Sequence, residues 1–304
     1  MEGNQQTDRP LSHTTPHGEW QADEPLNGEG PAGGQAVRMP ALGGIVVCAD
    51  DFGLNEAVDH AVLELAAARR LNATSCLVHG PSFTQNASAL RTAGIQTGLH
   101  VNFTEPLPGT SICMPLARFM RQAWLRRLDG AGVEFQIQSQ LDLFRQVMGR
   151  LPDFIDGHQH VHQFPVVREA LFRVLDRAFP SGIRPWLRYT RAGQLTGLPV
   201  SQRFKAAVIE HLGSAALARQ ARRRGYPLNR RFMGVYDFTG GQAGYQRLLQ
   251  AWLAHMQPGD LIMCHPARQA VTGDALGVQR EAEFRVLASD TLRDFMVQHS
   301  VPLA

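Results

Sequence analysis

The chain is nearly devoid of lysine, because Lys205 is the only one among its 304 residues. Arginine supplies the rest of the 30 basic side chains, which face 27 acidic ones for a formal net charge of +3. We attribute the arginine bias, together with the abundant alanine and glycine, to a GC-rich coding sequence. A charge this balanced argues against a nucleic-acid-binding protein, which would carry a marked basic excess.

Cysteine is sparse, and long apolar runs are missing. None of the four cysteines belongs to a C-x-x-C motif, and three lie inside apolar runs, so we expect reduced thiols rather than a disulfide framework. No segment approaches the roughly 18 consecutive apolar residues of a membrane span, and no basic-then-apolar leader opens the chain. With 44% hydrophobic and 19% charged residues, we expect a cytoplasmic globular protein without a membrane segment. The cysteines are Cys48, Cys76, Cys113 and Cys264.

The first 40 residues differ from the rest of the chain. They contain six acidic residues, two arginines, six glycines and five prolines, and they show no apolar periodicity. We therefore expect a disordered tail over residues 1–40 and a single barrel domain over residues 41–304. The segment 28–33 matches G-x-G-x-x-G, but no strand precedes it and a proline interrupts it, so it is not interpreted as a nucleotide site.

Short apolar runs alternate with helical periodicity from residue 44 onward. About seven such alternations predict parallel βαβ units. The fold class that we expect is α/β, an irregular (β/α) TIM-like barrel, with an open doubly wound sheet as the alternative. Long helices are expected over residues 201–224 and 281–299. The strands are expected to begin near Ile45, Thr74, Ile95, Phe154, Trp186, Phe232 and Leu261.

Polar side chains follow most of the predicted strands. In a (β/α) barrel the C-terminal strand ends meet on one rim, where active sites form. We therefore expect these residues to share an active site. They are Asp50, Asp51, His100, Asp156, Arg188, Asp237 and His265.

Asp50 and Asp51 are adjacent carboxylates, which repel each other unless a cation lies nearby. A divalent metal bound to one of them would leave the other as a general base beside metal-bound water. A helix N-cap is the alternative for one of the two. The string 51–53 also matches the kinase D-F-G motif, but the other kinase motifs are missing.

Histidines dominate the segment after the fourth predicted strand. If this segment is extended, His158, His160 and His162 share one face, where they could bind a metal or a substrate. His265 follows the last strand, and an unperturbed pKa of about 6.5 would suit a general acid. Arg188 either pairs with Asp50 and orients it or forms a surface ion pair.

Four strings resemble the YdjC family, which includes chitooligosaccharide deacetylases and hopanoid-associated deacetylases. They are V-C-A-D-D-F-G-L at 47–54, G-L-H-V-N at 98–102, D-G-H-Q-H-V-H at 156–162 and M-C-H-P at 263–266. The resemblance runs from about residue 44 to 298. It implies an irregular barrel related to polysaccharide deacetylases and metal-dependent hydrolysis of an N-acetyl group, with Mg²⁺ or Zn²⁺ as the cofactor.

The resemblance also implies roles for individual residues. Asp51, His100 and His158 would be metal ligands, Asp50 the base and His265 the acid. Arg188 would assist catalysis by analogy with an arginine of the related deacetylases, and His160 and His162 match the family string as substrate-binding residues.

The implied substrate is an N-acetylated amino sugar or glycolipid. Another metal-dependent amidohydrolase and a non-catalytic sugar- or lipid-binding protein remain alternatives. Amidohydrolases, however, usually have their H-x-H pair after the first strand, where this chain has two aspartates. The loop 104–117 and the basic segment 201–231 could set substrate choice. We interpret the arginines of 219–231 as a solvated helix face, rather than as a contact for anionic lipid or phosphorylated substrate. The oligomeric state is open, with a homo-oligomer as one option.

Overall fold

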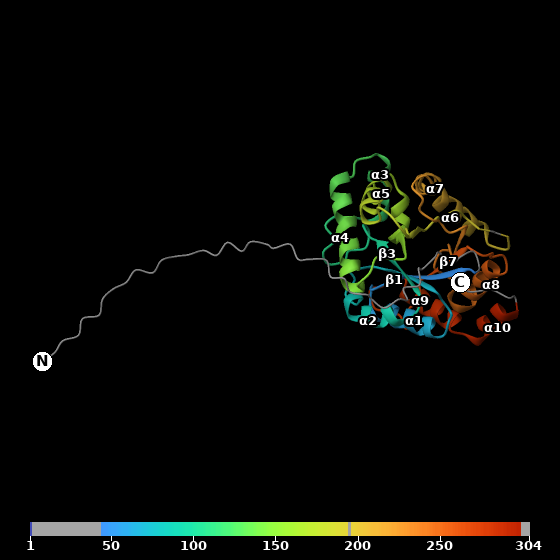
Figure 1. The fold of residues 1–304 in the computed structure, drawn as a ribbon. Helices are drawn as coiled ribbons and strands as arrows, with labels where there is room; N and C mark the ends of the chain where they lie inside the picture. Colours follow the sequence, from blue (N-terminus) through green and yellow to red (C-terminus); the bar gives the residue numbers. More distant parts are fainter. Residues whose placement is uncertain (2–43, 194–195, 299–304) are drawn as a thin grey trace. The chain divides into compact units, whose positions relative to one another are not determined.

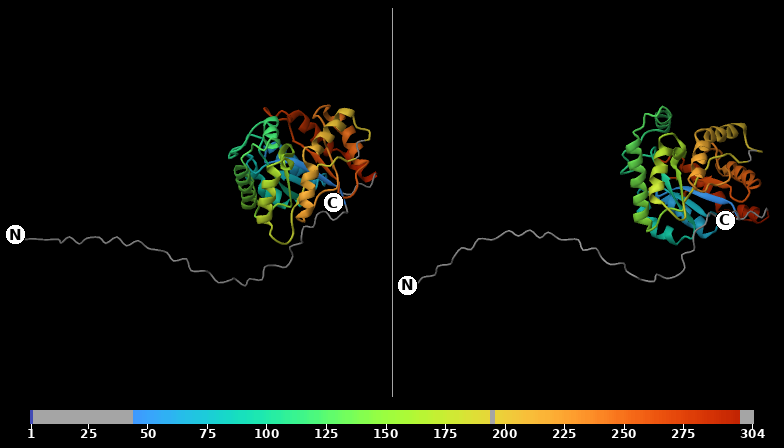
Figure 2. Two further views of the ribbon diagram at one scale, coloured as in Figure 1. Left: turned by 90° about the horizontal axis from the view of Figure 1, so that it is seen from above. Right: turned by 45° about the horizontal axis from the view of Figure 1, so that its top comes forward.

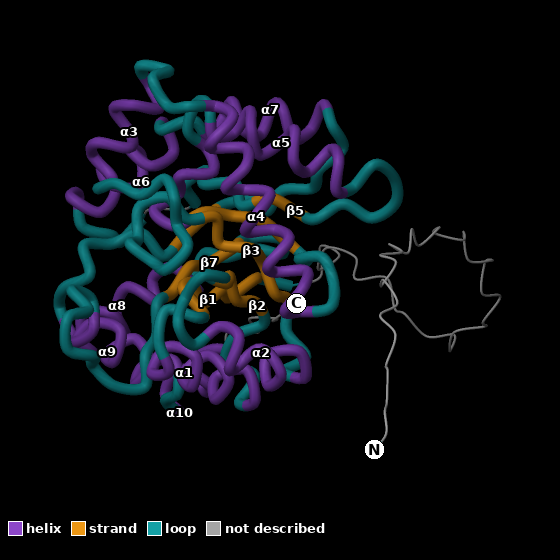
Figure 3. The backbone as a smooth tube through the Cα atoms, turned by 90° about the vertical axis from the view of Figure 1, so that its left-hand side faces the viewer, coloured by secondary structure: helices purple, strands orange, loops and turns teal. Residues whose placement is uncertain are grey.

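The computed structural model describes Met1, residues 44–193 and residues 196–298. The tail predicted over residues 1–40, with its glycine motif, lies outside the described residues apart from Met1. In the described part, strands lie in the centre and helices surround them (Figures 1 and 3). The strands are β1 (Val46–Phe52), β2 (Ala73–Cys76), β3 (Gln96–Val101), β4 (Phe154–Gly157), β5 (Trp186–Leu187), β6 (Phe232–Met233) and β7 (Leu261–Cys264).

The strands form one parallel sheet with the neighbour order of a barrel. The order is β5-β4-β3-β2-β1-β7-β6, so strands that follow one another in the chain lie side by side, except β5 and β6 at the two edges, and β7 returns to β1. Two isolated parallel bridges, Leu187 to Leu228 and Ala192 to Phe232, link the edges near β5 and β6. A doubly wound sheet would instead reverse its strand order at a switch point. The irregular barrel is thus confirmed as a seven-stranded parallel half-barrel, and the open-sheet alternative is wrong.

The helices cover the outside of the sheet, as the two further views in Figure 2 also show. Their inner faces and the outward side chains of the strands form the larger apolar core. None of the helices in residues 44–193 and 196–298 is long and apolar enough to cross a lipid bilayer. The helices are α1 (Glu56–Ala67), α2 (Phe83–Thr92), α3 (Leu116–Trp124), α4 (Gly130–Met148), η1 (His158–Gln163), α5 (Val167–Ala178), α6 (Val200–His211), α7 (Ser214–Arg223), α8 (Gly241–Leu253), α9 (Gly277–Leu287) and α10 (Asp290–Gln298).

A second, smaller apolar core fills the inside of the sheet. Val46 and Cys48 belong to it, whereas Val47 belongs to the outer core, as the period-two alternation of a strand requires. The rings of Phe154 and Trp186 stack here with centroids 4.2 Å apart. A side chain at Gly98 would lie 2.3 Å from the Phe154 ring, so only glycine fits on β3 at that point. This packing gives the polar strand ends a rigid base.

Two of the predicted helices are each divided in the structure. The segment 201–224 breaks at Gly213, whose φ of +121° ends α6 before α7 begins. A side chain there would approach the Gln163 carbonyl oxygen to 2.3 Å, so the break also accommodates η1. The segment 281–299 is divided between α9 and α10, where the Ser289 hydroxyl accepts a hydrogen bond from the Leu292 N–H (3.2 Å) and caps the second helix. Residue 299 lies outside the described part.

Candidate active site

Asp50 and Asp51 lie inside β1, at a bulge. In a regular strand, neighbouring side chains point to opposite faces. Here the pairing of β1 with β2 shifts between Ala49 and Phe52, and Asp51 has a left-handed φ of +71°. The bulge lets both carboxylates join one cluster of buried polar side chains. Asn55, rather than either aspartate, caps α1 by accepting from the Val58 N–H (3.1 Å), so the N-cap alternative is wrong.

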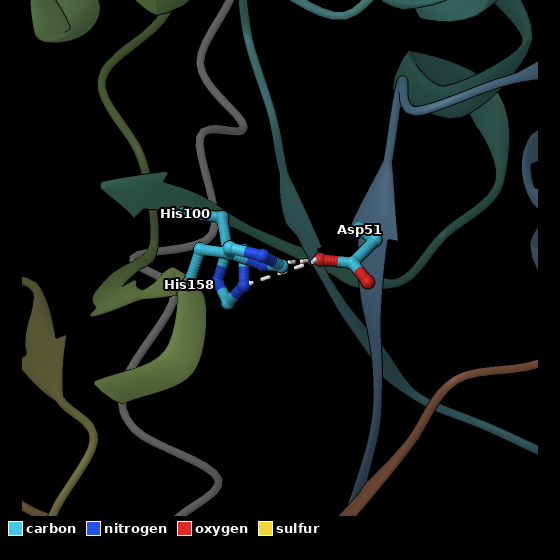
Figure 4. Close-up of side chains that lie close together, drawn as sticks. All are labelled: Asp51, His100 and His158. Atoms are coloured by element: carbon cyan, nitrogen blue, oxygen red, sulfur yellow. Dashed lines mark hydrogen bonds and ion pairs between the residues drawn. The ribbon is translucent and has the colours of Figure 1, made fainter. Parts of the chain in front are cut away.

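Asp51, His100 and His158 converge on one point (Figure 4). The Asp51 Oδ1 atom lies 3.1 Å from His158 Nδ1 and 3.4 Å from His100 Nε2. One ligand atom from each residue lies within 4.8 Å of the other two. One carboxylate oxygen and two imidazole nitrogens form a donor set suited to zinc and related divalent ions. The three predicted ligands, which come from β1, β3 and η1, could therefore hold a metal together.

The far side of His100 is arranged as in known metal sites. Its Nδ1 lies 2.6 Å from Asp156 Oδ1 and 3.0 Å from the Ser75 hydroxyl. A carboxylate behind a histidine fixes its tautomer and aims the other nitrogen at the metal. Burial opposes protonation of His100, but Asp156 and the neighbouring carboxylates raise its pKa to about 10. A cation bound at His100 Nε2 would take the place of that proton, so the residues fit a divalent ion.

Each of the adjacent aspartates has its own arginine. Burial would raise the pKa of Asp51, but Arg280 and the two histidines hold it well below the usual range. The Arg280 Nη2 group donates to Asp51 Oδ2 (2.7 Å), which leaves Oδ1 facing the histidines. For Asp50, burial likewise opposes ionisation, and Arg188 lowers the pKa far below the ordinary value. Both carboxylates are therefore ionised at neutral pH.

Arg188 is fully buried between two carboxylates. Its two terminal nitrogens donate to the two oxygens of Asp50, each at 2.6 Å. Its Nη2 also lies 2.6 Å from Asp156 Oδ2. The alternative of a surface ion pair is therefore wrong. Asp156 links this arginine to His100, so one buried network joins the predicted base to a predicted metal ligand.

His265 lies at the end of β7 beside Asp50. Its Nε2 is 4.0 Å from Asp50 Oδ2. Burial lowers the pKa of His265 to about 4, although both aspartates favour its charged form. The expectation of an ordinary histidine pKa is wrong for this environment, and the imidazole is neutral at pH 7. His265 must therefore take up a proton before it can act as a general acid.

The histidines of η1 do not share one face. The segment is a 3-10 turn, in which Gln159 and His160 have left-handed φ values of 52° and 61°, so the extended geometry is wrong. His160 packs edge-on against the Phe232 ring, with centroids 5.3 Å apart. The His162 Nε2 is hydrogen-bonded to the main-chain carbonyl of Arg188 (2.9 Å) and is fully buried. His162 therefore supports the Arg188 main chain, and substrate binding by either histidine stays a prediction.

Three residues of the network received no role from the sequence. The sequence predicts Asp156 at a strand end but indicates no individual role for it, although it lies inside the D-G-H-Q-H-V-H string. Arg280 and Glu283 come from α9, which shows no motif and lies far from β1 in the sequence. Conversely, Asp237 also follows a strand, but its side chain is exposed and stands outside these contacts.

Glu283 is a buried carboxylate that accepts hydrogen bonds from the His265 main-chain N–H (2.6 Å) and the Tyr236 hydroxyl (2.5 Å). Burial raises its pKa to about 7, despite these donors and Arg280. The pKa of Glu283 is higher in the folded protein than its ordinary value of about 4.5, which applies to the unfolded chain. Its contribution to stability is therefore complete below about pH 4.5 and is lost as the pH rises through about 7. Glu283→Gln should therefore remove part of the stability loss between pH 5 and 8. Urea denaturation at both values would measure it, and an unchanged pH dependence would contradict the assignment.

The chain is similar to known proteins over most of its length. The pattern of the family described as YdjC-like protein matches residues 44–298. The chain belongs to this family. A carbohydrate deacetylase of Homo sapiens is 30% identical over 296 residues, covering 85% of this chain and 88% of its own. A chitooligosaccharide deacetylase of Escherichia fergusonii is 29% identical over 130 residues, covering 40% of this chain and 52% of its own.

A solved structure has a similar fold. A structure from Enterococcus faecalis V583, described as a candidate cellobiose-phosphate cleavage protein, has a TM-score of 0.59 at 18% identity. It covers 86% of this chain and 96% of its own, and it shows a shared fold. The family match and the curated relatives confirm the predicted family and, at the level of the family, the predicted deacetylase class.

Proposed function

We propose that this YdjC-like protein removes the N-acetyl group of an amino sugar or a glycolipid by metal-dependent hydrolysis. The observation that carries the proposal is the arrangement of the cluster. Three ligand groups that fit a divalent ion lie next to an ionised carboxylate, Asp50, and a neutral imidazole, His265. The names of the curated relatives support the choice of an acetylated sugar as the substrate.

The metal would be held by Asp51, His100 and His158, with Mg²⁺ and Zn²⁺ as the candidates. The chemistry that a divalent ion supplies at such a site is polarisation of the amide carbonyl and a lower pKa of water. The donor set fits zinc by ligand type, while magnesium would need additional water ligands.

The remaining steps use the residues of this chain. Asp50, held ionised by Arg188, accepts a proton from the water that attacks the acetyl carbon. His265 delivers a proton to the amine nitrogen as the C–N bond breaks, giving acetate and the free amine. Because His265 rests neutral, it must be protonated within each cycle, and the Asp50 Oδ2 atom 4.0 Å away is the nearest group that has gained a proton. Asp50 thus passes one proton to His265 in each turnover.

Acetate release tests this proposal directly. The purified protein is assayed on a panel of N-acetylated sugars and glycolipids, with and without chelator, and then with Mg²⁺ or Zn²⁺ restored. We expect activity on at least one panel member, loss of activity with chelator, and recovery with one metal. An active enzyme that ignores chelator would contradict the metal role. A protein that binds the sugars without acetate release would favour the non-catalytic alternative.

Metal binding itself has an expected signature. Because the carboxylates hold a proton on His100 in the metal-free protein, binding of a divalent ion should release protons. Calorimetric titration in buffers of different ionisation enthalpy measures that release. We expect Asp51→Ala to abolish binding, and Asp142→Ala, on the exposed side of α4, to leave it unchanged.

A cytoplasmic location and a homo-oligomer remain predictions.

A further inference from the structure

The candidate site is accessible from one side. The side chains of Asp50, Asp51, His100, Asp156 and Arg188 are at most 2% exposed, whereas those of His158 and His265 are 13% and 11% exposed. Glu105, from the loop 104–117, has a carboxylate oxygen 3.7 Å from His158 Nε2. A substrate must therefore reach the cluster past His158 and His265, and the side chains that flank these two histidines would touch it.

Phe238 flanks His265 on this accessible side. Its ring is edge-on to the His265 imidazole, with centroids 5.0 Å apart and an angle of 80° between the planes. Phe238 is half-buried, and its ring also packs against Tyr236, with centroids 4.7 Å apart. Phe238 has a left-handed φ of +57°, which is unusual and strained for a bulky residue. Residues with strained backbone are enriched at active sites and ligand-binding sites.

Lys205 holds the Phe238 ring from α6. Its ammonium group donates to the Tyr236 carbonyl (2.5 Å) and lies 5.3 Å from the centroid of the Phe238 ring. This is a cation–π distance. In a chain that otherwise uses arginine for every basic side chain, the single lysine lies at this position. A compact ammonium group can donate to one carbonyl and lie over one ring without the wide fork of a guanidinium.

We propose that Phe238 is the platform that binds the sugar ring of the substrate, and that Lys205 fixes the position of this platform. This inference rests on the proposed function. In deacetylation of an amino sugar, the amine that His265 protonates is bonded directly to a carbon of the sugar ring. The ring must therefore lie beside His265, and Phe238 is the aromatic side chain that flanks it. An aromatic face binds the apolar C–H side of a pyranose and leaves its hydroxyls free for polar partners.

The test compares ring-removing and ring-keeping variants on an N-acetylglucosamine disaccharide. Phe238→Ala should raise KM by roughly tenfold, with a smaller change in kcat. Phe238→Tyr keeps the ring and should restore a KM close to that of the wild type. Lys205→Met should raise KM by roughly twofold to fivefold. Phe204→Ala is the matched control, because Phe204 lies on the same helix as Lys205 and is 71% exposed.

Two further measurements keep the test decisive. Phe238→Gly also removes the ring and suits the left-handed backbone, so it replaces the alanine variant if that one folds poorly. Binding of the disaccharide to the Asp50→Asn background, with and without Phe238→Gly, gives the affinity without turnover, and metal affinity reports whether the site is intact. Equal KM values and affinities with and without the ring would overturn the platform. Wild-type protein that releases no acetate from any sugar or glycolipid of the panel would instead overturn the proposed function.

Discussion

Replacing Asp50 by Asn is expected to lower kcat by about 10²- to 10⁴-fold, the range for loss of a positioned general base. Asparagine keeps the shape of the side chain and can still accept a hydrogen bond from Arg188, but it cannot take a proton from water. The three predicted metal ligands are untouched, so metal content should stay at the wild-type level. Steady-state acetate release together with metal analysis of the purified variant checks both halves.

The matched control for this variant is Asp142→Asn, which makes the same chemical change on the exposed face of α4. It should leave kcat and metal content unchanged. Near wild-type turnover by Asp50→Asn would show that another group removes the proton. Loss of metal from Asp50→Asn would mean that this residue is a ligand, and the division of roles between the two aspartates would then be wrong.

Replacing Arg188 by Met is expected to destabilise the protein by about 3–5 kcal/mol, the usual cost of breaking a buried ion pair from one side. The guanidinium is fully buried and forms ion pairs with both Asp50 and Asp156. Without it, two carboxylates remain in an interior from which water is excluded, and at least one must take up a proton. Urea denaturation measures the free energy of unfolding, and the loss should be larger at pH 8 than at pH 5.

Two comparisons separate this charge effect from lost packing. Arg203→Met, on the exposed side of α6, makes the same change at the surface and should alter stability by less than about 1 kcal/mol. Adding Asp156→Asn to Arg188→Met removes one of the stranded charges and should recover part of the loss. A single variant as stable as the wild type would show that the buried network contributes nothing to folding.

The predicted site residues gather because the sequence places most of them at the ends of parallel strands. Asp50, His100, Arg188 and His265 come from β1, β3, the end of β5 and the end of β7, and the barrel rule predicts that such residues meet. The same rule fails for Asp237, because β6 ends at Met233, four residues before it. Arg188 directly follows β5, which is equally short, whereas Asp237 lies on the loop beyond β6 and its side chain is exposed.

Contacts from outside the strand-end pattern were not predictable. Arg280 and Glu283 reach the site from α9, where they contact Asp51 and the His265 main chain. No local pattern marks Arg280, whose partner Asp51 lies 229 positions away in the sequence. The left-handed backbone at His160 was also invisible, because an alternating H-x-H-x-H string fits a strand as well as a 3-10 turn.

The sequence by itself determined the architecture and the chemical character of the site. Alternating strand and helix periods specify a parallel barrel, and the motif residues bring carboxylates and imidazoles to one rim. Tertiary structure alone decided which of them are charged. Arg188, which follows β5, and Arg280, from α9, keep Asp50 and Asp51 ionised although burial opposes it, whereas burial keeps His265 neutral. Charge state depends on distances between residues far apart in the chain, and only the folded packing sets those distances.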